Sequence, residues 1–202
     1  MPSASRLIDA FDAILFDLDG TLVDTMPLHY EAYRQVLQAH GLQLAWTDYI
    51  ALVGPPASEV IGSFVTAAGG NPASLDLRRL HGDKKAAFAD ILATRQPQRL
   101  PAANILDTAV GQVRCALVSS GNRHGVSAIL QALGWSERFE VIVTGDDVAN
   151  GKPDPEPYRL AATLMDIVPA RCAVLEDTPA GLMSARASGM TAFDVADLSF
   201  AA

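Results

Sequence analysis

Two aspartates, Asp17 and Asp19, lie one residue apart at the end of a short apolar run, and they are the residues of this sequence best suited to chemistry. The run Ala13–Phe16 predicts a buried strand, and Gly20 and Thr21 then turn the chain away. Because side chains alternate between the faces of a strand, residues two positions apart point the same way until the backbone bends. Two carboxylates on one side would repel each other, and a bound divalent cation or a shared proton would relieve that repulsion. A solvated acidic turn is the simpler alternative, which polar clusters at the ends of later apolar runs disfavour.

Short apolar runs alternate with helical patterns through most of the chain, as is typical of an α/β protein with a parallel sheet. Strands are predicted near residues 12–16, 114–118, 140–143, 172–175 and 190–194. Helical patterns span Gly125–Gly134, Pro155–Met165 and Thr178–Ser188, and Gly189 is a C-cap candidate for the last of them. We therefore expect an α/β, Rossmann-like core with a parallel sheet and helices on both of its faces.

Residues 26–95 break this alternation. Helical patterns occupy residues 28–40, 47–52, 57–68 and 75–93, with no convincing strand between them. A structureless connection of this length would be implausible, so the segment is expected to be a small α-helical insert. The expected domains are an α/β core of residues 1–25 and 96–202 and a helical domain of residues 26–95.

Polar side chains recur where four of the predicted strands or their connecting loops end. They are Asp17 with Asp19, Ser119 with Ser120, Lys152, and Glu176 with Asp177. In an open α/β sheet, ligands bind outside the carboxyl ends of the strands, so these groups should converge there. Carboxylates from two strand ends would form an oxygen-rich site that suits Mg2+, and a serine hydroxyl and a lysine would complete a cradle for a phosphoryl group.

Four motifs carry a family resemblance. They are Asp17-Leu18-Asp19-Gly20-Thr21, then Ser119 after Ala-Leu-Val, then Lys152 in Gly151-Lys152-Pro153-Asp154-Pro155-Glu156-Pro157-Tyr158, and finally Leu175-Glu176-Asp177-Thr178-Pro179-Ala180-Gly181. With these motifs in this order, nearly the whole chain resembles the haloacid dehalogenase superfamily of phosphotransferases that use an aspartate nucleophile. The helical insert resembles the α-helical cap of the β-phosphoglucomutase-like branch. Within that branch, Asp24–His29 and the overall layout are most similar to fructose-1-phosphatase-like sugar phosphatases.

The resemblance implies roles that the chemistry of the side chains supports. Asp17 would be the nucleophile that forms an aspartyl-phosphate, and Asp19 would be the general acid and base. Ser119 would hydrogen-bond the phosphoryl oxygens, and Lys152 would neutralise charge on the nucleophile and the phosphoryl group. The residues expected to hold Mg2+ are Asp17, Asp19 through its backbone carbonyl, Glu176 and Asp177.

The insert would select the substrate. His29 matches a position that couples cap closure to acid–base chemistry in the resembling enzymes, although a partly buried helix histidine is an equally good interpretation. Gly54 lies in the segment that corresponds to the specificity loop, but no arginine follows it as in the mutases. The remaining substrate candidates are Ser120, Asn122 and Arg123 after the second motif, and the cations Lys84 and Lys85, which are equally consistent with a solvated helix face.

Bulk composition narrows the function classes. The formal net charge of −8 and the pI near 4.8 argue against partners that are nucleic acids or anionic membranes. Cys115 and Cys172 begin predicted strands and have no metal-ligand or redox spacing. A cytoplasmic monomer or homodimer acting on a small phosphorylated molecule is the expected setting.

The sequence thus predicts a Mg2+-dependent phosphatase of a small phosphorylated metabolite, such as a sugar phosphate of the fructose-1-phosphate kind. The alternative is a sugar phosphomutase of the β-phosphoglucomutase type, which the missing arginine disfavours. A catalytically silent binding protein on the same scaffold is a third interpretation. Dehalogenation, also found in the superfamily, is disfavoured because it needs neither Asp19 nor a magnesium site.

Overall fold

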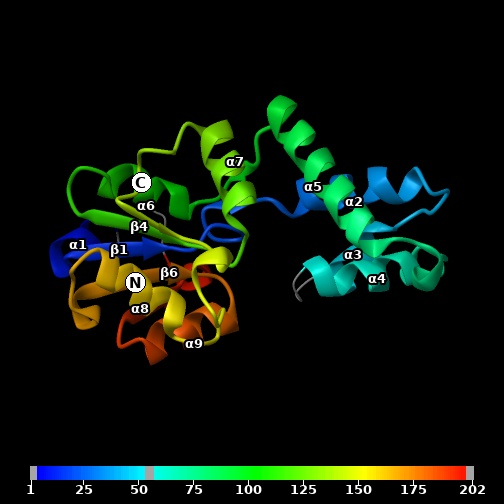
Figure 1. Ribbon diagram of the computed structural model, residues 1–202. Coiled ribbons are helices and arrows are strands. Elements are labelled where there is room, and N and C mark those ends of the chain that lie inside the picture. The colour runs from blue at the N-terminus through cyan, green and yellow to red at the C-terminus, as the bar shows by residue number, and fades with distance from the viewer. Residues whose placement is uncertain (1–3, 53–56, 199–202) are drawn as a thin grey trace. The chain divides into compact units, whose positions relative to one another are not determined.

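The computed structural model describes residues 4–52 and 57–198, except for the side chains of residues 57–59 (Figure 1). The chain divides into two compact units. One combines Met1–Thr25 with Pro97–Ala202, and the other is Met26–Gln96.

The first unit is built on a five-stranded sheet in which all neighbouring strands run parallel. Its spatial order is β5-β4-β1-β6-β7. The strands are β1 (Ala13–Phe16), β4 (Arg114–Val118), β5 (Val141–Val143), β6 (Cys172–Glu176) and β7 (Thr191–Asp194). The predicted parallel-sheet core is confirmed, because strands that are buried on both faces read as continuous apolar runs.

Helices cover both faces of this sheet. Figure 1 shows α8 (Glu156–Leu164) and α9 (Pro179–Ala187) on one side and α6 (Ala102–Ala109) and α7 (Arg123–Leu133) on the other. The short α1 (Ala4–Ala10) packs on α6 and β1. Alternate residues of the strands, such as Leu15, Val118 and Val174, form one core cluster with Tyr158 of α8 and with Met165, the C-cap residue of that helix.

A small antiparallel pair stands where the chain leaves and re-enters this unit. Its strands are β2 (Val23–Asp24) and β3 (Gln98–Arg99), which pair Val23 with Arg99 and Asp24 with Gln98. Neither strand was predicted, since two residues give no periodic signal. Short 3-10 helices complete the irregular segments: η1 (Pro72–Ser74), η2 (Gly145–Asp147), η3 (Pro169–Arg171) and η4 (Val195–Asp197).

The second unit is helical. It contains α2 (Met26–Gln38), α3 (Trp46–Leu52), α4 (Ala57–Ala67) and α5 (Leu77–Thr94), which match the four helical patterns of the sequence to within a few residues. Asp76 caps α5 by accepting hydrogen bonds from the backbone N–H groups of Arg78 and Arg79. The unit has its own core, which includes Tyr33, Tyr49, Phe64 and Leu80. Within the described part of the chain, no helix has the length and apolar character required to cross a membrane.

Candidate active site

The predicted catalytic residues of the α/β unit lie at the carboxyl ends of its central strands. Asp17 follows β1, Ser119 follows β4, and Glu176 is the last residue of β6. Because β1 pairs with both β4 and β6, these three side chains belong to one edge of the sheet. All three residues are buried, with 7%, 4% and 1% exposure respectively.

Lys152 joins these strand ends through its ammonium group. Its Nζ donates to Asp17 Oδ1 at 2.6 Å, to Glu176 Oε1 at 2.6 Å and to the carbonyl of Val118 at 2.9 Å. The side chain is only 5% exposed, so its three N–H groups find their acceptors inside the protein. Burial alone would lower the pKa of Lys152, but the charges of Asp17 and Glu176 hold that pKa well above its usual value. The ammonium group is therefore a fixed positive charge beside the predicted nucleophile.

Glu176 is the most thoroughly hydrogen-bonded acid of the site. Its Oε1 accepts from Lys152 and from the Tyr158 hydroxyl at 3.3 Å. Its Oε2 accepts from the backbone N–H groups of Asp177 and Thr178 at 3.0 and 2.9 Å, and from the Thr178 hydroxyl at 2.9 Å. This arrangement suits a carboxylate that orients Lys152 and the following turn.

An acidic cluster at this edge fits a divalent cation. Carboxylate oxygens of Asp17, Glu176 and Asp177 lie within 4.8 Å of one another. Burial raises the pKa of Asp17 to about 8 against the opposing charge of Lys152, with Glu176 and Asp19 adding to the rise. Burial also raises the pKa of Asp177. A hard cation among these oxygen donors would offset the mutual repulsion and favour the ionised carboxylates, as Mg2+ does in oxygen-rich sites.

The turn after β1 brings Asp19 to the same edge. The Thr25 hydroxyl donates a short hydrogen bond to Asp19 Oδ1, and Thr25 is itself buried. Gly20 has a φ of +90°, and a Cβ at this position would overlap the Asp177 carboxylate, so the turn requires glycine. The Thr21 hydroxyl donates to Asp177 Oδ1 at 2.9 Å, which ties this turn to the end of β6.

The loop after β4 is connected to the loop after β5. Ser119 Oγ accepts from the backbone N–H of Gly121 at 3.0 Å. The backbone N–H of Arg123 donates to Asp146 at 2.9 Å, and the Arg123 guanidinium forms an ion pair with Asp147. Asp147 is fixed in turn by the backbone N–H and the hydroxyl of Thr144, at 2.8 and 2.7 Å.

Two predicted substrate residues take ordinary structural positions in this loop. Asn122 is the N-cap of α7, and its side chain accepts from the backbone N–H of Gly125 at 2.9 Å. The positive charge of Arg123 is paired with Asp147. Ser120 is exposed beside them.

The predicted residues of the helical unit form a pair of their own. Lys84 Nζ lies 2.9 Å from His29 Nδ1, and the His29 ring stacks on Phe88 with 4.0 Å between ring centroids. Because an ammonium group can only donate, His29 Nδ1 accepts and the neutral ring carries its proton on Nε2. Burial and the charge of Lys84 lower the pKa of His29 to about 3. Lys85 is exposed, and Gly54 lies outside the described residues.

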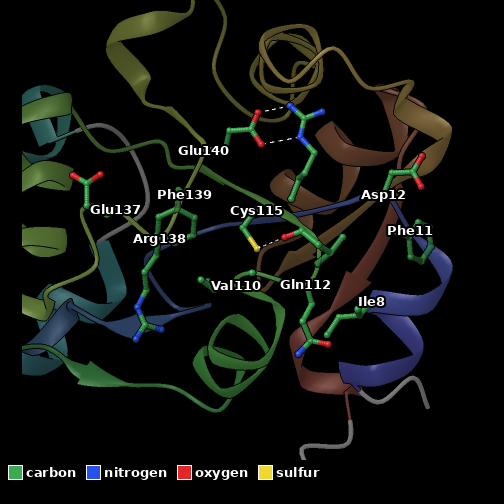
Figure 2. A pocket seen from close by; sticks show the side chains of 13 residues that line it. Ile8, Phe11, Asp12, Val110, Gln112, Cys115, Glu137, Arg138, Phe139 and Glu140 are labelled. Carbon is green, nitrogen blue, oxygen red and sulfur yellow. Dashed lines mark hydrogen bonds and ion pairs between the residues drawn. The ribbon is translucent and has the colours of Figure 1, made fainter.

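A pocket of about 690 Å3 lies at the amino ends of the strands (Figure 2). Its lining includes Phe11, Cys115 and Phe139, together with the ion pair between Arg114 and Glu140. None of the predicted catalytic residues lines it. This position, opposite to the carboxyl ends of the strands, separates the pocket from the acidic cluster.

Comparison with known proteins identifies the family of this chain. The family model of haloacid dehalogenase-like hydrolases matches residues 11–189. The fructose-1-phosphate phosphatase YqaB of Escherichia coli (strain K12) is 33% identical over 190 residues, which cover 94% of this chain and 98% of that protein. A phosphorylated carbohydrates phosphatase of Thermotoga maritima is 31% identical, with 89% and 82% covered. The crystal structure of CbbY from Rhodobacter sphaeroides in complex with phosphate is similar with a TM-score of 0.78 and 32% identity, covering 95% of this chain and 91% of that chain.

The fold is thus that of an α/β hydrolase, and an aspartate follows the first parallel strand. This chain belongs to the haloacid dehalogenase-like hydrolase family. It is an enzyme, and its class is that of the phosphoric monoester hydrolases.

Proposed function

We propose that this enzyme is a Mg2+-dependent phosphatase that hydrolyses a small sugar phosphate through an aspartyl-phosphate on Asp17. The observation that carries the proposal is the buried contact of 2.6 Å between Lys152 Nζ and Asp17 Oδ1, beside the acidic cluster with Asp177. Two relatives are named as phosphatases of fructose-1-phosphate and of phosphorylated carbohydrates, and CbbY of R. sphaeroides has been crystallised with xylulose-(1,5)bisphosphate. These names support a phosphorylated sugar as the substrate.

In the first step, a carboxylate oxygen of Asp17 attacks phosphorus and the bond from phosphorus to the sugar oxygen breaks. Asp19 donates a proton to the departing sugar oxygen, while Lys152 and the Ser119 hydroxyl stabilise negative charge on the phosphoryl oxygens. Asp17, Asp177 and the backbone carbonyl of Asp19 would hold Mg2+, with Glu176 within the same cluster. When bound, this ion supplies charge neutralisation for the nucleophile and the phosphoryl group.

In the second step, Asp19 accepts a proton from water, and the water oxygen attacks the phosphorus of the aspartyl-phosphate. Inorganic phosphate leaves and Asp17 is restored. The hydrogen bond from Thr25 holds the Asp19 carboxylate in one orientation, which favours its use in both steps. In this proposal the helical unit is the cap, and the neutral imidazole of His29 and the ammonium group of Lys84 belong to the part that selects the sugar.

A phosphate-release screen over hexose and pentose phosphates, with Mg2+ or with EDTA, tests this proposal. We expect release from at least one ketose phosphate, loss of release in EDTA, and loss of turnover with retained substrate binding in Asp17→Asn. Release by Asp17→Asn within tenfold of the wild type would remove Asp17 as the nucleophile. Isomerisation that requires a sugar bisphosphate and releases no free phosphate would instead establish the mutase.

A further inference from the structure

Tyr158 lies directly beside the Lys152–Glu176 ion pair, within α8. It has no exposed surface and belongs to the core cluster between α8 and the sheet. Its ring centroid lies 5.1 Å from Lys152 Nζ, and its hydroxyl donates to Glu176 Oε1 at 3.3 Å. One side chain therefore contacts both members of the ion pair that faces Asp17.

The two contacts differ in chemistry. A cation over an aromatic face is attracted by the ring quadrupole, most strongly where water is excluded. The three N–H groups of Lys152 already have oxygen acceptors, so the ring limits where the ammonium group can move. The hydroxyl contacts the same oxygen of Glu176 that Lys152 binds, and it limits how that carboxylate can rotate.

We propose that Tyr158 is a positioning residue for phosphoryl transfer, which holds Lys152 through its ring and Glu176 through its hydroxyl. This inference rests on the proposed function, because that function gives Lys152 its part in phosphoryl transfer. The competing interpretation is that Tyr158 only fills the core between α8 and the sheet, as Met165 does from the C-cap position of the same helix.

Three variants separate these interpretations. Tyr158→Phe keeps the ring and removes the hydroxyl, and Tyr158→Leu removes both. Met165→Ala is the matched control, because Met165 is fully buried in the same cluster. Among the described residues, it forms neither a hydrogen bond nor a ring contact with Lys152.

We expect kcat to fall about tenfold in Tyr158→Phe and about a hundredfold in Tyr158→Leu, with KM changed less than about threefold, because Lys152 acts most strongly on charge in the transition state. Met165→Ala should lower the melting temperature and leave kcat within about threefold, measured well below that temperature. Equal losses of kcat in Tyr158→Leu and Met165→Ala, or unchanged kcat in both Tyr158 variants, would overturn the positioning role.

A second readout does not depend on turnover. The ε-methylene resonance of Lys152, assigned with Lys152→Arg, should carry a ring-current shift in the wild type. We expect Tyr158→Phe to retain this shift and Tyr158→Leu to lose it, whether or not the enzyme proves to be a phosphatase. A Lys152 resonance that is the same in all variants would overturn the proposed placement of the ammonium group, even if the phosphate-release screen succeeds.

Discussion

Gly181 offers a sharp test of how tightly the site is built. It is the third residue of α9, and its backbone N–H donates to Thr178 Oγ1 at 3.0 Å. A Cβ placed on Gly181 would overlap the Glu176 carboxylate. Replacing glycine by alanine in a helix usually stabilises a protein by up to about 1 kcal/mol. Gly181→Ala should therefore destabilise the protein only if the close approach to Glu176 is real.

The expected change in the free energy of unfolding follows from the displacement of the Glu176 carboxylate. An added methyl group in a filled core costs about 1–3 kcal/mol, and separating the buried Lys152–Glu176 pair costs about 3–5 kcal/mol. Because displacement of the Glu176 carboxylate would relieve the overlap with the new methyl group, only the cost of separating the pair remains. Subtracting about 1 kcal/mol of helix gain from about 3–5 kcal/mol leaves an expected net loss of about 2–4 kcal/mol in the free energy of unfolding. Because Lys152 would lose its fixed position, kcat should also fall about a hundredfold or more.

Gly125→Ala is the matched control. Gly125 is the third residue of α7, its N–H also donates to the side chain of its N-cap residue, and a Cβ there would meet its nearest atom at an ordinary 3.5 Å. Urea unfolding can be followed by the fluorescence of Trp135 in a Trp46→Phe background, since the chain has two tryptophans and Trp135 is buried in the α/β unit. Gly125→Ala should be neutral or stabilising. If Gly181→Ala behaves the same way and keeps full activity, the placement of Glu176 against α9 is wrong.

Three further predictions concern other parts of the site. Asp19→Asn should slow both formation and hydrolysis of the aspartyl-phosphate in rapid-quench experiments, and slowed hydrolysis alone would remove Asp19 as the acid for the leaving sugar. Gly20→Ala should raise the Mg2+ concentration needed for half-maximal activity at least tenfold, because the new methyl group would overlap Asp177 at a backbone φ of +90°; an unchanged magnesium titration would contradict this. The pKa of His29 is lowered to about 3, so between pH 6.5 and 3 only the unfolded chain takes up a proton at this residue. The free energy of unfolding therefore falls as the pH falls through this range, by up to about 1.4 kcal/mol per pH unit. Urea titrations should show a smaller slope over this range in His29→Gln, and an equal slope would mean that His29 titrates normally.

Much of the fold could be predicted because its signals are local. The central strands are short continuous apolar runs, and the polar clusters follow them directly, as at Asp17 and Glu176. Since the five strands of the main sheet run parallel, their carboxyl ends meet at one edge. This is why residues 135 positions apart, such as Asp17 and Lys152, form a buried ion pair. The helices α1 and α6, of seven and eight residues, were not predicted.

The supporting contacts could not be predicted, because they depend on packing rather than on residue order. Tyr158 reads as an ordinary apolar position of a helix, and only its place against β6 reveals the contact with Glu176. The sequence marks Asn122 as a polar loop residue and a substrate candidate, and only the structure shows that its side-chain oxygen caps α7. Asp147 looks in the sequence like an ordinary acidic turn residue. In the structure it forms a capping box with Thr144 and also an ion pair with Arg123.

The charge balance of the site explains why these supporting contacts matter. Asp17, Glu176 and Asp177 bring carboxylates together from two strand ends, and Lys152 is the one ammonium group that bonds directly to them within the described part of the chain. One of its partners, Glu176, accepts five hydrogen bonds, which fix the position of its carboxylate. Because Lys152 is bonded to this fixed carboxylate, its ammonium group stays beside Asp17. The pKa of Asp17 is nevertheless raised to about 8, so one lysine is not enough to keep this buried carboxylate ionised near neutral pH. A divalent cation bound beside Asp177 would add a second positive charge at the carboxyl ends of the strands, and we expect it to favour the ionised form of Asp17, the proposed nucleophile.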